Sequence, residues 1–164
     1  MINLIKMFTV DEGYRDMAYL DTTGHVTVGI GFNMDSPNAR ETWADAGIHD
    51  NFDLVYNRTI PITLDEAWAL LNTCIDNCKT DLLSILHDFD SYPENIKMAL
   101  INLCFNLGLP KLTGFTTFLG RIRLGNYAGA ALDLSMTLWA MQLPERAKRV
   151  CQLINGDDSF YLTN

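Results

Sequence analysis

The sequence predicts an α+β fold in which one long helix joins a small β-meander to a helical remainder. Residues 15–34 alternate apolar and polar positions around glycine-containing turns, which is typical of short antiparallel strands. Residues 63–86 keep apolar side chains at spacings of three and four, as one face of a continuous helix does. The residues that follow show helical periodicity only. A helix in that position most simply joins two lobes and contributes to both.

The composition fits one globular domain, or two lobes that share a core. The chain has 164 residues, 48% of them hydrophobic, and a formal net charge of −8. This acidity argues against nucleic acid as a partner and gives no attraction to anionic membranes. No apolar run approaches the roughly 20 residues of a membrane span. The first residues also make a poor signal peptide, so we expect synthesis in a cytosol and no stable membrane association.

The first third of the chain contains the predicted strands. Residues 2–11 predict a short amphipathic helix, and residues 15–34 a three-stranded meander with turns near residues 21–24 and 29–31. Ser36 and Pro37 form an N-cap and first-turn pair, which predicts a helix that ends at Gly47. We expect a loop with a short extended piece over residues 48–62.

The remainder is predicted to be helical. Thr63 and Glu66 match a capping box at the start of the long helix. The segment from Pro93 to Gly108 is apolar nearly all round, which places it in the middle of a core. Further helices are expected to start near Gly114, Asn126 and Pro144. The predicted organisation is a single domain over residues 1–164. It has an N-terminal lobe at about 12–62, a connecting helix at about 63–86, and a helical lobe at about 87–164 that includes the helix 2–11.

The four cysteines lie in apolar periodic segments rather than in loops (Cys74, Cys78, Cys104 and Cys151). Buried free thiols are the favoured state, with one disulfide as the alternative. No histidine flanks them at ligand spacing, so we expect no metal site and no cofactor.

Three polar residues near the N-terminus form a candidate hydrolase site. Glu12 is expected at a helix end, Asp21 before a hairpin turn, and Thr27 on the returning strand. Cleavage of a glycosidic bond needs one protonated carboxyl group and one ionised carboxylate. The alternative for each residue is structural: a surface charge for Glu12, a turn former for Asp21, and strand propensity for Thr27.

Other candidates have equally plain structural explanations. Arg146 either lies on a solvated helix face or reaches a catalytic carboxylate. Phe105 and Trp139 could stack on sugar rings, although aromatic residues on apolar helices usually belong to the core. The three histidines (His25, His49 and His87) have no partner spacing, and we assign them no role.

The stretch from Glu12 to Gly31 resembles the active-site motif of the bacteriophage-type lysozymes, glycoside hydrolase family 24. The family pattern is Glu, eight residues, Asp, five residues, Thr, and Glu12, Asp21 and Thr27 fit it without a gap. The resemblance continues through residues 99–102, Phe105, residues 114–116, Trp139 and residues 144–150, so it covers nearly the whole chain. Length differences are confined to about residues 34–95.

The resemblance implies a two-lobed, lysozyme-like α+β fold. It also implies hydrolysis of the β-1,4 bond between N-acetylmuramic acid and N-acetylglucosamine in peptidoglycan glycan strands. Glu12 is then the proton donor, while Asp21 and Thr27 hold the attacking water, with inversion at the anomeric carbon. The two carboxyl groups should be roughly 6.5–9.5 Å apart. Arg146 matches the arginine that pairs with the catalytic glutamate, and Gly31 and Trp139 are supporting positions.

The same resemblance implies substrate-binding positions at Asn33, Phe105, Asn106, Phe118 and Asp133. Phe105 fits the family, Asn106 replaces a longer amide, and the other three differ in character. Phe32 stands where the family often has a histidine, so a stabilising His–Asp pair is expected to be absent.

We therefore expect a monomeric, bacteriolytic endo-muramidase made in the host bacterial cytoplasm and acting in the periplasm or cell wall. The alternatives are a non-catalytic peptidoglycan-binding module of the same fold and a lytic transglycosylase. An injected effector or a prophage enzyme would share the chemistry of an endolysin. The net charge of −8 is unusual for an enzyme that acts on an anionic wall.

Overall fold

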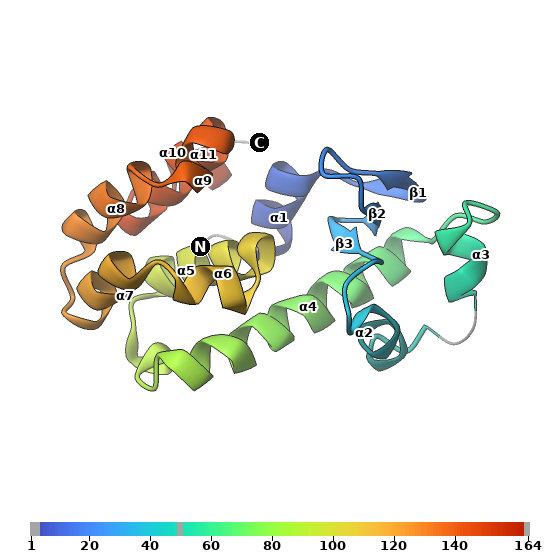
Figure 1. The fold of residues 1–164 in the computed structure, drawn as a ribbon, viewed down its shortest axis with the longest axis horizontal. Coiled ribbons are helices and arrows are strands. Elements are labelled where there is room, and N and C mark those ends of the chain that lie inside the picture. Colours follow the sequence, from blue (N-terminus) through green and yellow to red (C-terminus); the bar gives the residue numbers. More distant parts are fainter. Residues whose placement is uncertain (1–3, 49–50, 163–164) are drawn as a thin grey trace. The chain divides into compact units, whose positions relative to one another are not determined.

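The computed structural model describes residues 4–48 and 51–162, which form two compact units (Figure 1). One unit extends to Asp76 and the other begins at Asn77, so the boundary falls within a single helix. The α+β class predicted from the sequence is confirmed. Residues 2 and 3 of the predicted first helix, and His49, lie outside the described residues.

The first unit contains the only sheet among the described residues, a small antiparallel meander. Its elements are α1 (Leu4–Glu12), β1 (Arg15–Leu20), β2 (Val26–Gly29), β3 (Phe32–Asn33), α2 (Ala39–Asp45) and α3 (Phe52–Tyr56). The strand order is β1-β2-β3, as the alternation predicted. Helix α1 was expected to accompany the C-terminal lobe, whereas it belongs to this first unit.

The register of the sheet aligns three polar side chains. Tyr19 lies opposite Thr27, and Thr27 lies opposite Asn33 on the third strand. Residues directly opposite each other in an antiparallel pair present their side chains on the same face. The side chains of Tyr19, Thr27 and Asn33 therefore share one face of the meander.

Two expectations for residues 36–62 need correction. Helix α2 begins at Ala39 rather than at Pro37, after Asn38. The segment expected to be a loop contains α3, a helix too short for its periodicity to be recognised. The α3 residue Phe52 is buried and packs edge-on against Trp43, with ring centroids 5.3 Å apart. Tertiary packing of this kind stabilises a five-residue helix that local propensity would leave unformed.

Helix α4 (Leu64–Ile85) is the predicted long helix, and its capping box is present. The Thr63 backbone N–H donates to Glu66 Oε2 at 2.7 Å, and the Glu66 N–H donates to Thr63 Oγ1 at 3.2 Å. Its buried stripe runs through both units (Ala67, Leu70, Leu71, Ile75, Cys78 and Leu82).

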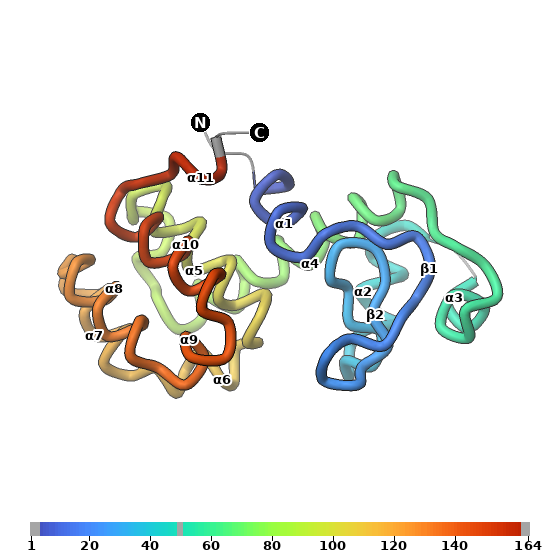
Figure 2. The backbone as a smooth tube through the Cα atoms, turned by 90° about the horizontal axis from the view of Figure 1, so that it is seen from above, coloured from blue at the N-terminus to red at the C-terminus, as the bar shows by residue number. Residues whose placement is uncertain are grey.

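The second unit is helical. After η1 (Phe89–Ser91) come α5 (Glu94–Leu107), α6 (Leu109–Thr113), α7 (Thr116–Arg123), α8 (Tyr127–Ser135), α9 (Leu138–Gln142), α10 (Pro144–Ile154) and α11 (Ser159–Leu162). Helix α10 packs against α5 and α8, and α7 packs against α8 (Figure 2). Residues 98–104 of α5 are all buried, which confirms its predicted central place in the core.

The sequence analysis missed the short helices α6, α9 and α11 and placed the other starts within two residues. Each missed helix has only four or five residues, about one turn, which leaves too few positions for a hydrophobic period. The four cysteines are all free thiols, two buried (Cys78 and Cys104) and two partly exposed (Cys74 and Cys151).

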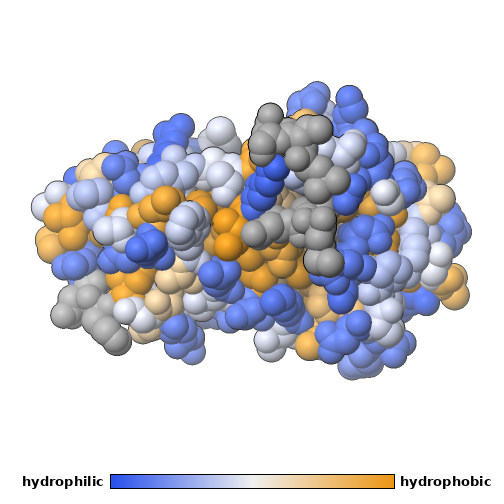
Figure 3. Space-filling view, turned by 180° about the vertical axis from the view of Figure 1, so that it is seen from behind, coloured by the Kyte–Doolittle hydropathy of each residue, from blue (hydrophilic) through white to orange (hydrophobic). Residues whose placement is uncertain are grey.

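The surface charge is unevenly divided along the chain. Residues 1–76 contain 12 acidic and 4 basic residues, whereas residues 77–164 contain 8 of each. The net charge of −8 therefore lies entirely in the first 76 residues. Hydrophilic residues and hydrophobic groups are interspersed on the face shown in Figure 3, and the most extended hydrophobic area lies near the middle of the view. None of the described helices is both long and apolar enough to cross a membrane.

Candidate active site

Glu12 is the last residue of α1, and its side chain lies against the β2–β3 turn. A Cβ at position 31 would lie about 3 Å from the Glu12 carboxyl group, so only glycine leaves room for it. Gly31 also has a φ of +71°, a conformation that glycine adopts without strain. The resemblance implied only a supporting position for Gly31, and the structure adds the reason for the glycine.

Asp21 follows β1 and accepts three hydrogen bonds on one carboxylate oxygen. Its Oδ1 accepts from the Thr23 N–H at 2.8 Å, the Thr23 hydroxyl at 2.8 Å and the His25 N–H at 2.9 Å. Among the described residues, no hydrogen bond reaches its Oδ2. Desolvation acts to raise the pKa of Asp21, but the bonds from His25 and Thr23 outweigh it and leave that pKa below its usual value. Asp21 is thus held as an oriented carboxylate with one oxygen open to a ligand.

Thr27 lies in the middle of β2 and is 4% exposed. Its hydroxyl donates to the His25 carbonyl oxygen at 3.3 Å. A hydroxyl that donates to the main chain still has lone pairs with which to accept a hydrogen bond from a water. This arrangement fits the role that the resemblance implied for Thr27.

Tyr19 lies within electrostatic range of both carboxylates, and the sequence analysis gave it no role. The pKa of its phenol is raised, first by burial and then by the negative charges of Glu12 and Asp21, while Arg15 acts in the opposite direction. The Arg15 guanidinium lies 4.2 Å from the centre of the Tyr19 ring. Glu12 and Asp21 both lie in the first unit, within electrostatic range of this phenol, and their membership of one site stays a prediction. The predicted separation of their carboxyl groups stays a prediction.

Asn33, a predicted substrate-binding residue, is on the same sheet face as Thr27 and Tyr19. Its Oδ1 accepts a hydrogen bond from the Asp35 N–H at 2.8 Å. The side-chain amide therefore has a fixed orientation next to strand β2.

Three predicted residues come together in the second unit. Phe105 and Asn106 are at the C-terminal end of α5, and Asn106 Oδ1 accepts a hydrogen bond from Trp139 Nε1 at 2.8 Å. Trp139 is 6% exposed, so it supports Asn106 from within the core rather than presenting its ring face to solvent. Phe105 is partly exposed.

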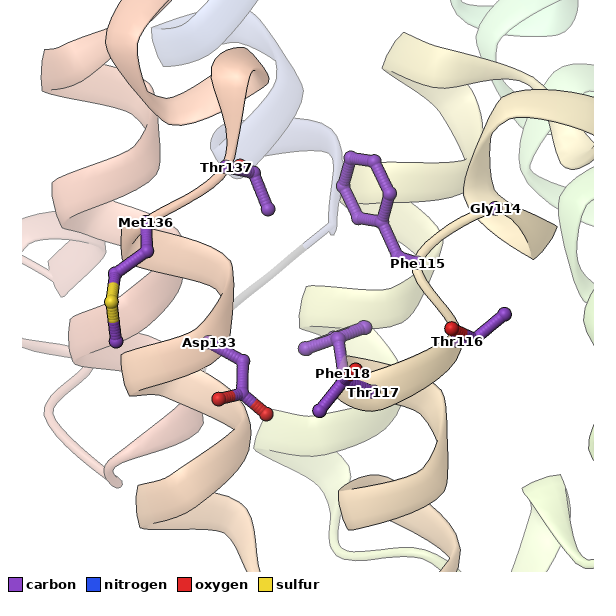
Figure 4. A pocket seen from close by; sticks show the side chains of 8 residues that line it. All are labelled: Gly114, Phe115, Thr116, Thr117, Phe118, Asp133, Met136 and Thr137. Carbon is purple, nitrogen blue, oxygen red and sulfur yellow. The ribbon is translucent and has the colours of Figure 1, made fainter.

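Phe118 and Asp133 line one pocket of about 300 Å³ between α7 and α8 (Figure 4). Phe118 is 2% exposed and forms the wall of the pocket from inside the core. The Asp133 carboxylate accepts a hydrogen bond from Arg121 Nε at 2.5 Å, an ion pair that the sequence did not predict. The remaining lining is apolar or hydroxylic (Gly114, Phe115, Thr116, Thr117, Met136 and Thr137).

Arg146 is near the start of α10 and is 6% exposed, so the solvated-face explanation is wrong. Its Nε donates to Asn102 Oδ1 on α5 at 2.9 Å, a bond between two buried residues of the second unit. The pairing predicted between Arg146 and Glu12 joins residues of different units and stays a prediction.

A family model described as phage lysozyme matches residues 10–154, which include every candidate residue above. This chain belongs to the phage lysozyme family. The resemblance seen in the spacing of Glu12, Asp21 and Thr27 is thereby confirmed. The protein is a glycoside hydrolase of the lysozyme class, with peptidoglycan as the substrate that the family implies.

Two relatives match this chain over most of their own length, and a third matches it over a smaller part. "Probable T4-type lysozyme 2" of Dictyostelium discoideum is 31% identical over 162 residues, covering 92% of each chain. "Probable T4-type lysozyme 1" of the same organism is 29% identical over 168 residues, covering 94% of this chain and 95% of the relative. "Pre-baseplate central spike protein Gp5" of Enterobacteria phage T4 is 27% identical over 161 residues, which are 93% of this chain but 28% of that protein.

Main-chain groups also take part in the candidate site. His25 was assigned no role, yet its N–H and C=O contact Asp21 and Thr27. Almost every residue type has the same main-chain N–H and C=O groups, so the sequence gives no signal for a role of the main chain. Tyr19 could have been predicted from the sequence, because counting residues outward from the β1–β2 turn places it opposite Thr27. No group of histidine, cysteine, aspartate and glutamate side chains in the described ranges could hold a metal ion.

Proposed function

We propose that this member of the phage lysozyme family is an inverting endo-muramidase. The bond cleaved is the β-1,4 linkage between N-acetylmuramic acid and N-acetylglucosamine in peptidoglycan. The observation that carries the proposal is the state of Asp21, whose Oδ1 is fully engaged by main-chain and hydroxyl donors while Oδ2 is open. An ionised, oriented carboxylate with an open oxygen is what the base of an inverting glycosidase requires.

Each residue has one role in the proposed reaction. Glu12 gives its proton to the leaving O4 of N-acetylglucosamine as the bond to C1 of N-acetylmuramic acid breaks. A water that donates hydrogen bonds to Asp21 Oδ2 and to the Thr27 hydroxyl attacks C1 from the opposite face, and Asp21 takes the proton that this water loses. Proton exchange with solvent then returns both carboxyl groups to their starting states. The first products carry the α configuration at C1.

The product anomer gives the sharpest test of this mechanism. Proton NMR during the first turnovers of wild-type enzyme on purified glycan strands should show the α anomer before mutarotation. Glu12→Gln and Asp21→Asn should each lower kcat by about 10³-fold or more, because each removes a proton-transfer group. Glu41→Gln, which changes an exposed acid on α2, is the matched control and should retain activity. A first-formed β anomer would exclude inversion.

The two alternatives predict different products. A lytic transglycosylase forms 1,6-anhydro ends without adding water, so its products are lighter by one water than those of hydrolysis. A non-catalytic binding module releases no reducing ends at all. Mass spectrometry of digested peptidoglycan therefore separates all three, and we expect the hydrolysed form.

We propose that the biological role is lysis of a bacterial host, with synthesis in the cytoplasm and action on the wall from the periplasm. Family membership supports this role. The likeness to one part of the larger Gp5 spike protein keeps an enzyme carried by an assembly as the second candidate. Expression in a Gram-negative host, with and without a separate membrane pore, tests the first role. Lysis that depends on the pore is expected, whereas no lysis under either condition would contradict it.

A further inference from the structure

The peptide unit between His25 and Val26, in the β1–β2 hairpin, contacts both Asp21 and Thr27, the residues proposed to hold the attacking water. The carbonyl oxygen of His25 accepts from the Thr27 hydroxyl at 3.3 Å and from the Asp21 N–H at 2.9 Å. The N–H of His25 donates to Asp21 Oδ1 at 2.9 Å. The position of the His25 main chain therefore sets the relative position of Asp21 and Thr27.

The opposite end of that peptide unit is bonded to Asp35. The Val26 N–H, which follows the His25 carbonyl in the same planar group, donates to Asp35 Oδ2 at 2.8 Å. His25 Nδ1 also lies 3.5 Å from Asp35 Oδ2. Because a peptide unit is rigid, fixing its N–H also fixes the direction of its carbonyl group. Asp35 thus constrains His25 through both the main chain and the side chain.

Asp35 is itself held from a different element. The Tyr56 hydroxyl, at the end of α3, donates to Asp35 Oδ1 at 2.7 Å. The two carboxylate oxygens of Asp35 therefore connect α3 to the start of β2. The Asp35 side chain is 25% exposed, and the residue lies at the surface of the first unit.

We propose that Asp35 is a positioning residue for the Asp21–Thr27 pair, acting through the His25–Val26 peptide unit and supported by Tyr56. This inference rests on the proposed function, because Asp21 and Thr27 need exact placement only if they hold the attacking water. Asp35 touches neither substrate nor water in this scheme. Its loss should therefore slow the chemical step and leave substrate binding unchanged.

The test compares Asp35→Asn with Tyr56→Phe and with a matched control, Asp53→Asn. Asp53 also accepts hydrogen bonds from a side chain of the same unit, but its donor is Arg40 on α2 rather than a group of the hairpin. We expect Asp35→Asn to lower kcat about tenfold with KM within about twofold of wild type, since small displacements of catalytic groups cost rates of this order. Tyr56→Phe should have a smaller effect in the same direction, and Asp53→Asn should match wild type in kcat.

Amide hydrogen exchange supplies a readout that does not depend on activity. Exchange at the Val26 amide should accelerate about tenfold in Asp35→Asn, because a neutral amide replaces its carboxylate acceptor, and less in Tyr56→Phe. The His25 amide, which donates to Asp21, should exchange faster as well because its neighbouring peptide unit is held less firmly. The same amides in Asp53→Asn should exchange as in wild type. Should Asp35→Asn fail to fold, Tyr56→Phe retains the carboxylate and carries both measurements.

The outcomes separate the inference from the function on which it rests. Equal kcat losses in Asp35→Asn and Asp53→Asn, or unchanged exchange at His25 and Val26, would overturn the positioning role of Asp35. A wild-type enzyme that releases no reducing ends from peptidoglycan would instead overturn the proposed function. In that case the exchange measurement alone would still decide whether Asp35 orders the hairpin.

Discussion

Gly31 lies so close to Glu12 that a Cβ at position 31 would be 2.9 Å from Glu12 Cγ and 3.0 Å from its Oε2. Contacts this short force one group to move. The side chain of Glu12, the proposed proton donor, therefore packs against Gly31 at a point where a larger residue would not fit.

Gly31→Ala should displace the Glu12 carboxyl group and lower kcat. We expect about a tenfold loss, together with a destabilisation of about 1 kcal/mol from the positive φ of residue 31. Gly47→Ala is the matched control, because Gly47 has a φ of +75° and a Cβ added there would meet nothing within 4 Å. Steady-state kinetics and thermal unfolding should show equal stability losses but a kcat loss in Gly31→Ala alone. A similar kcat loss in both variants would contradict the contact argument.

The hydroxyl of Thr23 should influence the acid limb of the pH–rate profile. Folding lowers the pKa of Asp21, so the stabilisation from its hydrogen bonds is present above the unfolded pKa and is lost as pH falls through the folded pKa. Thr23→Val removes one of the donors to Asp21 Oδ1 and should raise that pKa, which moves the acid limb of kcat/KM to higher pH. Thr22→Val alters an exposed neighbour in the same turn and should leave the limb in place. If the acid limb of kcat/KM does not move in Thr23→Val, that limb reports the pKa of a group other than Asp21.

The hydrogen bond between Asn106 and Trp139 should contribute to stability. Asn106→Ala leaves the buried Trp139 Nε1 without its acceptor, which should cost about 1 kcal/mol, or about 3 °C in Tm. In a Trp139→Phe background the same substitution should cost close to nothing, because the donor is already gone. Thermal unfolding of the wild type, the two single variants and the double variant measures the coupling free energy between Asn106 and Trp139. Additive losses would show that Asn106 acts through something other than Trp139.

Salt should accelerate the wild-type enzyme on whole walls. The net charge of −8 repels an anionic wall, and raising the ionic strength from about 0.01 M to 0.1 M shortens the Debye length from about 30 Å to 10 Å. We expect the initial rate of turbidity loss to rise over this range. A variant with Glu41→Lys and Asp45→Lys, both on the exposed face of α2, should show a weaker rise. A rate that falls with salt would indicate a cationic binding surface that dominates the encounter.

Strong local signals in the sequence were sufficient for the large elements. The capping box at Thr63 and Glu66, the long stripe of α4 and the apolar segment of α5 each repeat a pattern over many residues, so each was predicted and observed. Helices α3, α6, α9 and α11 span at most five residues. Their stability depends on packing partners far away in the chain, such as Trp43 for Phe52, and no local pattern reports this.

By itself the sequence determined the α+β class, the meander, the long helix and the family, because periodicity and the spacing of Glu12, Asp21 and Thr27 are properties of the linear chain. Only the tertiary structure decided how those residues are held. The contact of Gly31 with Glu12, the engagement of one oxygen of Asp21, and the link from Tyr56 through Asp35 to the hairpin all depend on atoms brought together by folding. Hydrogen bonds and close contacts act over a few ångströms in space, whatever the separation in sequence, so they become visible only when the backbone has its final path.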